Sequence, residues 1–155
     1  KDGKSDGIVT WWYENGQIKS VGQYKDGYSV STDYKYHENG QISEEINFKN
    51  GKEDGKWIEW YKNGQKKFEG AVKNGMIDGN ITYWYENGQK ESEGYLKDDK
   101  MVGKHTFWYE NGQISQEANF KNGNLDGKSY LWHENGQIKA EANFKNGVCT
   151  SGDCD

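Results

Sequence analysis

The sequence contains no proline and no arginine, and only 32% of its 155 residues are hydrophobic. Its mean hydropathy is −1.21. No apolar run approaches the roughly 20 residues that a membrane-spanning helix requires, and no signal peptide is visible. These shortages argue against a large compact core and against a membrane helix.

The lack of arginine also bears on partners. All 20 basic residues are lysine, and the formal net charge is −5. Nucleic acids and anionic membrane surfaces select clustered positive charge, and bidentate recognition of phosphate or guanine usually uses arginine. We therefore expect no nucleic-acid partner and no membrane association.

Aromatic residues are the one abundant apolar class. They make up 15% of the chain, with 7 tryptophans and 11 tyrosines. A chain this polar would often be disordered, because it buries too little apolar surface to offset its conformational entropy. Since each aromatic ring buries a large area, the composition predicts a chain that folds as a thin structure.

An internal repeat of 24 residues decides the fold. The tripeptide Asn-Gly-Gln recurs without insertion at Asn15, Asn39, Asn63, Asn87, Asn111 and Asn135. A second pair follows at Asp26-Gly27, Asn50-Gly51, Asn74-Gly75, Asn122-Gly123 and Asn146-Gly147, with Asp98-Asp99 in the fourth copy. Asn-Gly and Asp-Gly favour the two-residue type I′ turn of a β-hairpin, and the runs between them are rich in strand-forming residues. The prediction is an all-β fold: an elongated, single-layer antiparallel β-meander of six 24-residue hairpin repeats.

The repeat also suggests the domain organisation. Residues 1–148 form the array, and residues 149–155 form a C-terminal tail with two cysteines. Because Lys1-Asp2-Gly3 matches Lys25-Asp26-Gly27, the array is expected to begin partway through a repeat, as in a mature form or a piece of a longer chain.

A two-residue turn at every Asn-Gly fixes a strand register. It places Trp12 opposite Lys19 and Tyr13 opposite Ile18. Trp60 then faces Lys67 and Trp132 faces Lys139, as cation–π pairs. Across the second turn the same rule pairs Glu45 with Lys56, Glu93 with Lys104, Glu117 with Lys128, Gly70 with Gly79, Gly94 with Gly103 and Ala118 with Gly127.

Alternation along each strand then divides the aromatic residues between two faces. One face carries Tyr13, Tyr61, Tyr85 and Tyr109 with Ile18, Ile42, Ile114 and Ile138, and continues through Tyr24, Phe48, Phe120 and Phe144. The other carries the tryptophan column Trp12, Trp60, Trp84, Trp108 and Trp132 among charged and amide residues. These rings hold a thin sheet together, but regularly spaced Trp and Tyr are also typical of binding hot spots. Both columns are therefore candidate partner-binding residues.

The repeat resembles the MORN repeat (membrane occupation and recognition nexus) in its bacterial variant form. The motif is carried by residues 117–128, from Glu117 through Phe120-Lys121-Asn122-Gly123 to Asp126-Gly127-Lys128, and by residues 132–137. The resemblance implies a twisted single-layer sheet with a groove, and attachment to protein or lipid. It brings no shared catalytic residues. Residues 28–31 and Asp98-Asp99 depart from the motif, so local turn geometry is expected to differ there without loss of the fold.

No catalytic or metal site is expected. His37 and His133 stand in the repeat position otherwise held by Tyr, and no histidine pair, His105 included, has the short spacing of a metal site. The column Glu45, Glu69, Glu93, Glu117 and Glu141 is what duplication of a repeat produces, with lysines to pair it. We therefore predict a non-enzyme without cofactor or metal.

Cys149 and Cys154 are separated by four residues that include a glycine. They can close a small disulfide loop in an oxidising compartment, and a pair of free cytosolic thiols is the alternative. A disulfide that clasps the last strand would indicate export.

These observations leave several functions open. The leading hypothesis is a scaffold, exported or at the bacterial cell surface, that binds a protein partner along its aromatic face. An intracellular antitoxin or immunity protein that blocks a basic toxin is the second. A carbohydrate-binding module and lipid attachment rank behind. End-to-end self-association through exposed terminal strands is also expected.

Overall fold

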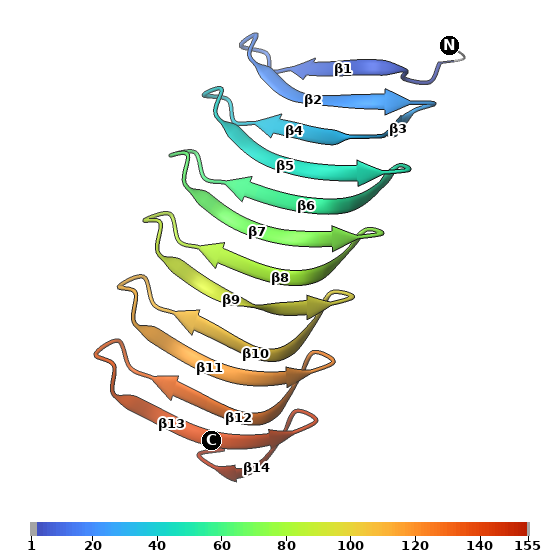
Figure 1. The fold of residues 1–155 in the computed structure, drawn as a ribbon. Helices are drawn as coiled ribbons and strands as arrows, with labels where there is room; N and C mark the ends of the chain where they lie inside the picture. Colours follow the sequence, from blue (N-terminus) through green and yellow to red (C-terminus); the bar gives the residue numbers. More distant parts are fainter. Residues whose placement is uncertain (1–2, 155) are drawn as a thin grey trace. The chain divides into compact units, whose positions relative to one another are not determined.

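The computed structural model describes residues 3–154, so Lys1, Asp2 and Asp155 lie outside the described residues. The chain divides into two compact units, Lys1–Met76 and Ile77–Asp155. None of the described residues is helical, so they include no helix that is long and apolar enough to cross a membrane. Within each unit the strands form an open antiparallel layer that follows the order of the chain (Figure 1). The predicted fold class, an all-β antiparallel meander of hairpin repeats, is confirmed.

The strands of unit 1 are short and are joined alternately by wide and tight loops (Figure 1). They are β1 (Gly7–Trp12), β2 (Ile18–Lys25), β3 (Tyr28–Ser29), β4 (Thr32–Tyr36), β5 (Ile42–Lys49), β6 (Lys52–Trp60) and β7 (Lys66–Lys73). The brief β3 shows that the departure at residues 28–31 interrupts one strand without ending the meander.

Unit 2 repeats the same hairpin. Its first strand, β8 (Met76–Trp84), begins at the last residue of unit 1. The others are β9 (Lys90–Lys97), β10 (Lys100–Trp108), β11 (Ile114–Lys121), β12 (Asn124–Trp132), β13 (Ile138–Lys145) and β14 (Val148–Gly152). The predicted boundary between array and tail falls inside β14, because this strand continues the sheet beside β13.

The tight loops are two-residue turns, as predicted. Asn122 and Gly123 have φ angles of 52° and 83°, the two positive values that a type I′ turn requires, and Lys121 pairs with Asn124 across the turn. Asp98 and Asp99 adopt the same conformation, with φ angles of 48° and 61°. The fourth turn therefore keeps its geometry without glycine.

The Asn-Gly-Gln loops differ from the prediction of a second two-residue turn. Gly16 donates its N–H to the Tyr13 carbonyl at 2.9 Å, and Tyr13 donates to the Gln17 carbonyl at 2.8 Å. Only Gly16 has a positive φ, 82°. This is a three-residue hairpin loop, in which a turn is followed by a left-handed glycine that forms a bulge.

The longer loop shifts the register at the five tryptophans that precede these loops. Trp12 faces Ile18 and not Lys19, and Trp132 faces Ile138 and not Lys139. Trp60 likewise faces Lys66, while Lys67 pairs with Glu59 at 2.8 Å. The predicted opposition of Trp12 to Lys19, Trp60 to Lys67 and Trp132 to Lys139 is therefore wrong, as is the separation of Trp12 and Ile18 onto opposite faces.

A second irregularity changes the pairs across the tight turns. Between the pairs Ile46–Trp57 and Phe48–Glu53, strand β6 carries two more residues than β5. Gly55, at a φ of 126°, makes this bulge, and the Asn47 side chain replaces the missing ladder bond by accepting the Lys56 N–H at 2.7 Å. The predicted opposition of Glu45 and Lys56 is therefore wrong.

The β9–β10 and β11–β12 hairpins of unit 2 show the same shift. Glu93 faces Thr106, Glu117 faces Tyr130 and Ala118 faces Ser129. Gly94 and Gly103 are not partners, because Gly103 lies in the bulge between Val102 and Thr106. The lysines form ion pairs with the next strand instead: Lys104 with Glu117, and Lys128 with Glu141 at 3.3 Å.

The corrected register defines two faces in each unit. We call the side that bears Gly22 and Gly70 in unit 1, and Gly94 in unit 2, the glycine face. The opposite side, which bears Glu45 and Glu69 in unit 1 and Glu93, Glu117 and Glu141 in unit 2, is the glutamate face. Most buried hydrophobic residues lie on the glycine face: Ile46, Phe68 and Val72 in unit 1, and Ile81, Ala118 and Ala142 in unit 2. Tyr24 and Phe120 share this face and not that of Ile18, which corrects the predicted division.

His105, on the glycine face of unit 2, is the largest fully buried side chain among the described residues. Its side chain is 1% exposed, and its ring lies edge-on to that of Phe120, with ring centroids 5.2 Å apart. Its Nε2 is 3.0 Å from the carbonyl oxygen of Tyr95. Because a carbonyl only accepts, Nε2 carries the proton. Burial lowers the pKa of this imidazole, and the hydrogen bond to Tyr95 opposes part of the shift. A Cβ at Gly94 would overlap the ring. The glycine therefore makes room for the histidine.

Hydrogen bonds at both margins join successive repeats. Asn111 accepts the Gln113 N–H at 2.9 Å and donates to the Glu134 carbonyl of the next repeat at 3.1 Å. The same two bonds are made by Asn15, Asn39 and Asn87. At the tight turns, Gly123 donates its N–H to the Met101 carbonyl of the preceding hairpin at 3.0 Å.

We predict that Asn111→Ala lowers the free energy of unfolding by about 1–2 kcal/mol, because it removes two hydrogen bonds at once. Urea denaturation measures this loss. The control is Asn135→Ala in the last repeat, whose Nδ2 donates only to Gln137 within its own loop, at 3.3 Å. Equal losses in the two variants would show that the bond to the next repeat contributes nothing.

A second prediction concerns the fit of His105 over Gly94. Gly94→Ala should destabilise the chain by about 1–3 kcal/mol through overpacking. In a His105→Ser background the same change should cost little, because the equivalent positions of the next repeat already pair Ala118 with Ser129. A double-mutant cycle of unfolding free energies measures the coupling, and strictly additive costs would contradict the predicted contact.

Candidate partner-binding surface

The predicted tryptophans occupy one repeated place. Each ends a strand directly before an Asn-Gly-Gln loop: Trp12 on β1 and Trp60 on β6 in unit 1, and Trp84, Trp108 and Trp132 on β8, β10 and β12 in unit 2. Trp12 is 60% exposed, whereas the other four are partly buried. The column is thus a structural row of partly buried rings with one exposed member, Trp12.

Contacts in unit 2 show which way these rings point. Trp132 lies beside Tyr130, with ring centroids 5.7 Å apart, and Tyr130 belongs to the row of Glu117 and Glu141. The Lys90 ammonium lies 5.6 Å from the Trp108 ring centroid. The rings therefore lie on the glutamate face, among lysines and carboxylates, as the sequence predicted.

Four glutamates of this face, Glu69, Glu93, Glu117 and Glu141, are partners in ion pairs. Glu69 accepts from Lys66 at 2.6 Å, and Glu93 accepts from Lys90 at 2.6 Å. The hydrogen bond from Lys66 is the main cause that lowers the pKa of the Glu69 carboxyl. A general acid near neutral pH needs a raised pKa, so Glu69 has the character of a structural ion-pair partner. No group of three or more potential metal ligands occurs among residues 3–154.

The predicted tyrosine column contributes to the loops instead of to a strand. Tyr13, Tyr85 and Tyr109 donate their hydroxyls to carbonyls of the next repeat at 2.6–2.7 Å. His37 replaces a tyrosine here, and its Nε2 is 2.9 Å from the Trp60 carbonyl. Tyr61 stands at the same repeat position and is also partly buried. The hydroxyls join repeats, and a role of these rings in partner binding stays a prediction.

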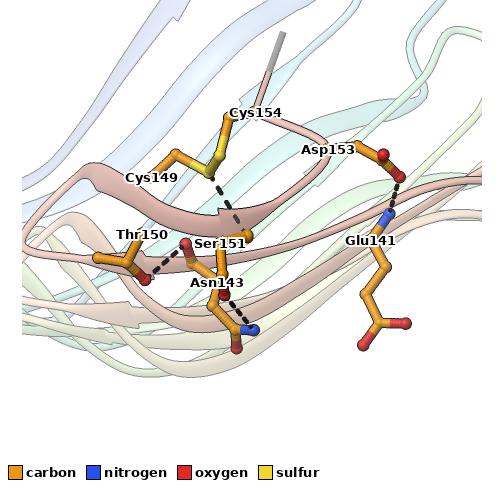
Figure 2. Close-up of a disulfide and its surroundings, with 7 residues drawn as sticks. All are labelled: Glu141, Asn143, Cys149, Thr150, Ser151, Asp153 and Cys154. Atoms are coloured by element: carbon orange, nitrogen blue, oxygen red, sulfur yellow. Dashed lines mark hydrogen bonds between the residues drawn. A yellow bond between two sulfur atoms is a disulfide. The ribbon is translucent and has the colours of Figure 1, made fainter.

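The cysteine tail folds across the last hairpin. Cys149 and Cys154 are joined by a disulfide, and Asp153 accepts the Glu141 N–H at 3.1 Å (Figure 2). Thr150 and Ser151 both bond to Asn143 of β13. A Cβ at Gly152 would overlap the Glu141 carbonyl oxygen, so the close approach requires glycine there. The disulfide therefore closes a loop that already pairs with β13.

Sequence reasoning missed a groove on the glycine face of unit 1. Its volume is about 290 Å³, and its lining includes Trp11, Tyr24 and Asp33. Two signals were present. Within the six repeats, Asp33 is the only carboxylate in a position held otherwise by Val9, Trp57, Ile81, His105 and Ser129. Trp11 stands where Lys35, Glu59, Tyr83, Phe107 and Leu131 stand.

Comparison with known proteins addresses the repeat directly. The MORN repeat variant matches residues 5–26, 34–50, 53–74, 77–98, 101–122 and 125–146, well over half of the chain. A search of curated proteins finds no match. MORN repeats generally form non-catalytic scaffolds that interact with protein or lipid. Together with the hairpin geometry of both units, the six matches show that the chain belongs to the MORN repeat variant family.

Proposed function

We propose that this chain is a non-catalytic scaffold that binds a protein partner along its glutamate face, with the main contact at the β1–β2 hairpin of unit 1. The observation that carries the proposal is a set of exposed large apolar side chains there. Ile8, Trp12 and Ile18 are 76%, 60% and 41% exposed. Exposed apolar patches of this kind typically mark interaction sites.

The three side chains belong to one face. Trp12 and Ile18 are cross-strand partners, and Ile8 lies on the same side of β1 because side chains two and four residues apart share a face. Ile8 is also unusual within the repeat, since its position is otherwise polar: Thr32, Lys56, Asn80, Lys104 and Lys128. Folding therefore does not require an isoleucine at this position.

Truncation of this patch tests the proposal. In a pull-down from the native cell envelope and cytosol, Trp12→Ala/Ile18→Ser should lower the amount of the captured partner about tenfold or more, because a hot-spot tryptophan contributes about 2 kcal/mol or more. Quantitative mass spectrometry measures the loss. Trp84→Ala/Trp108→Ala tests whether binding extends along the row in unit 2.

The matched control is Ile138→Ser, which removes a 63% exposed isoleucine at the equivalent place of the last repeat. Circular dichroism checks that every variant stays folded. A partner that is retained in full by folded Trp12→Ala/Ile18→Ser and Trp84→Ala/Trp108→Ala variants would overturn the proposal. Size-exclusion chromatography shows whether the captured species is a second copy of this chain.

An exported or cell-surface location is the second part of the proposal. It is supported by the Cys149–Cys154 disulfide, because such bonds persist in oxidising compartments. We expect the intact mass of native material to be lower than that of the reduced chain by two hydrogens. Free thiols in native material would favour instead the intracellular antitoxin or immunity protein, for which the net charge of −5 suits a basic toxin.

A further inference from the structure

The groove on the glycine face of unit 1 is built around one carboxylate. Asp33 lies beside Gly22, and a Cβ at Gly22 would overlap its carboxyl group. The position is therefore arranged to admit this side chain, as Gly94 admits His105. None of the other five repeats places an acid at the position of Asp33, although Asp153 follows at the same interval in the C-terminal tail.

Two neighbours fix the orientation of this carboxylate. Ser29 donates its hydroxyl to Asp33 Oδ1 at 2.7 Å, and Tyr24 donates its hydroxyl to Oδ2 at 3.2 Å. Burial, followed by the charge of Asp33, raises the pKa of the Tyr24 phenol, so Tyr24 stays a donor. Because each carboxylate oxygen has two lone pairs, both oxygens can accept a further hydrogen bond.

Aromatic rings wall the same groove. Trp11 and Tyr24 lie edge to face, with centroids 5.7 Å apart and planes at 75°, and Trp11 is 42% exposed. The groove of about 290 Å³ therefore combines two ring walls with a fixed negative charge. A cation over a Trp or Tyr face is attracted by the ring quadrupole, and the attraction grows when a carboxylate accepts from the same group.

The lysines nearby leave this charge in place. Lys35, which also lines the groove, pairs with Glu44 at 2.8 Å. The ammonium of Lys19, another lining residue, lies 5.8 Å from the ring centroid of Tyr13. Both lysines thus have partners of their own, and neither forms an ion pair with Asp33 among the salt bridges of the described residues.

We propose that this groove receives a basic side chain of the protein partner, an arginine or a lysine, which stacks on Trp11 and forms a salt bridge with Asp33. The inference rests on the proposed function and names the chemistry of the partner. Charge complementarity supports it, since the chain carries a net charge of −5 and has no arginine of its own. A neutral sugar would also stack on the tryptophan, so the experiment separates the two ligands.

The test titrates the whole chain with Nα-acetyl-arginine amide and follows the Trp11 indole N–H by two-dimensional NMR. We expect a saturable shift with a dissociation constant in the millimolar range, as suits one side chain. Nα-acetyl-citrulline amide, which has a similar shape without the charge, and methyl glucoside should shift the signal at least tenfold less at equal concentration.

Variants decide which groups recognise the probe. Asp33→Asn should weaken binding about tenfold or more, as should Trp11→Leu followed through the Tyr24 ring signals. Asp54→Asn, which removes one negative charge elsewhere in unit 1, should leave binding unchanged. Circular dichroism checks folding, and Trp11→Leu keeps the inference testable if Asp33→Asn fails to fold.

Three results would overturn the inference: equal shifts with the citrulline probe, a larger response to methyl glucoside, or equal losses in Asp33→Asn and Asp54→Asn. The outcome is distinguishable from that of the proposed function. If the arginine probe fails while capture of a partner still depends on Trp12, only the groove assignment is wrong. If the probe binds but the folded Trp12→Ala/Ile18→Ser and Trp84→Ala/Trp108→Ala variants both retain the partner in full, the proposed binding along the glutamate face is wrong.

Discussion

Hydrogen bonds from the loops of one repeat to the backbone of the next are the interaction on which this fold depends. A single layer with 32% hydrophobic residues has little apolar surface to bury. At one margin the loop asparagines and the Tyr13, Tyr85 and Tyr109 hydroxyls reach forward by 23 residues, and at the other the tight turns bond back to the preceding hairpin. The free energy of unfolding is therefore close to a sum of contributions from each pair of adjacent repeats, as in other repeat proteins.

Local chemistry explains why the hairpins could be predicted from the sequence. Asn-Gly and Asp-Gly supply left-handed backbone at the tight turns, and the 24-residue interval places them without reference to tertiary structure. The register could not be predicted in the same way. Asn15-Gly16 fits either a two-residue turn or a three-residue loop, and only the pairing of Trp12 with Ile18 distinguishes them.

The candidate site was predicted in part for the same reason. The tryptophan column lies on the glutamate face, as expected, because alternation along one strand survives a change in the loop. The groove of Trp11, Tyr24 and Asp33 needed the correct register, since these residues come from three strands that meet only when β1, β2 and β4 are aligned. The bulge at Gly55, where two extra residues enter the sheet, has a similar effect on the glutamate pairs.

The bonds at the loop margins also constrain how such a chain can change over evolution. An insertion of one residue in a strand would displace a loop asparagine from the carbonyl 23 residues onward and a tight turn from the hairpin before it. The constant interval seen in all six copies is the expected result. Length can therefore vary only by gain or loss of whole repeats, while point substitutions at positions such as those of Ile8 and Asp33 give individual repeats their own surfaces.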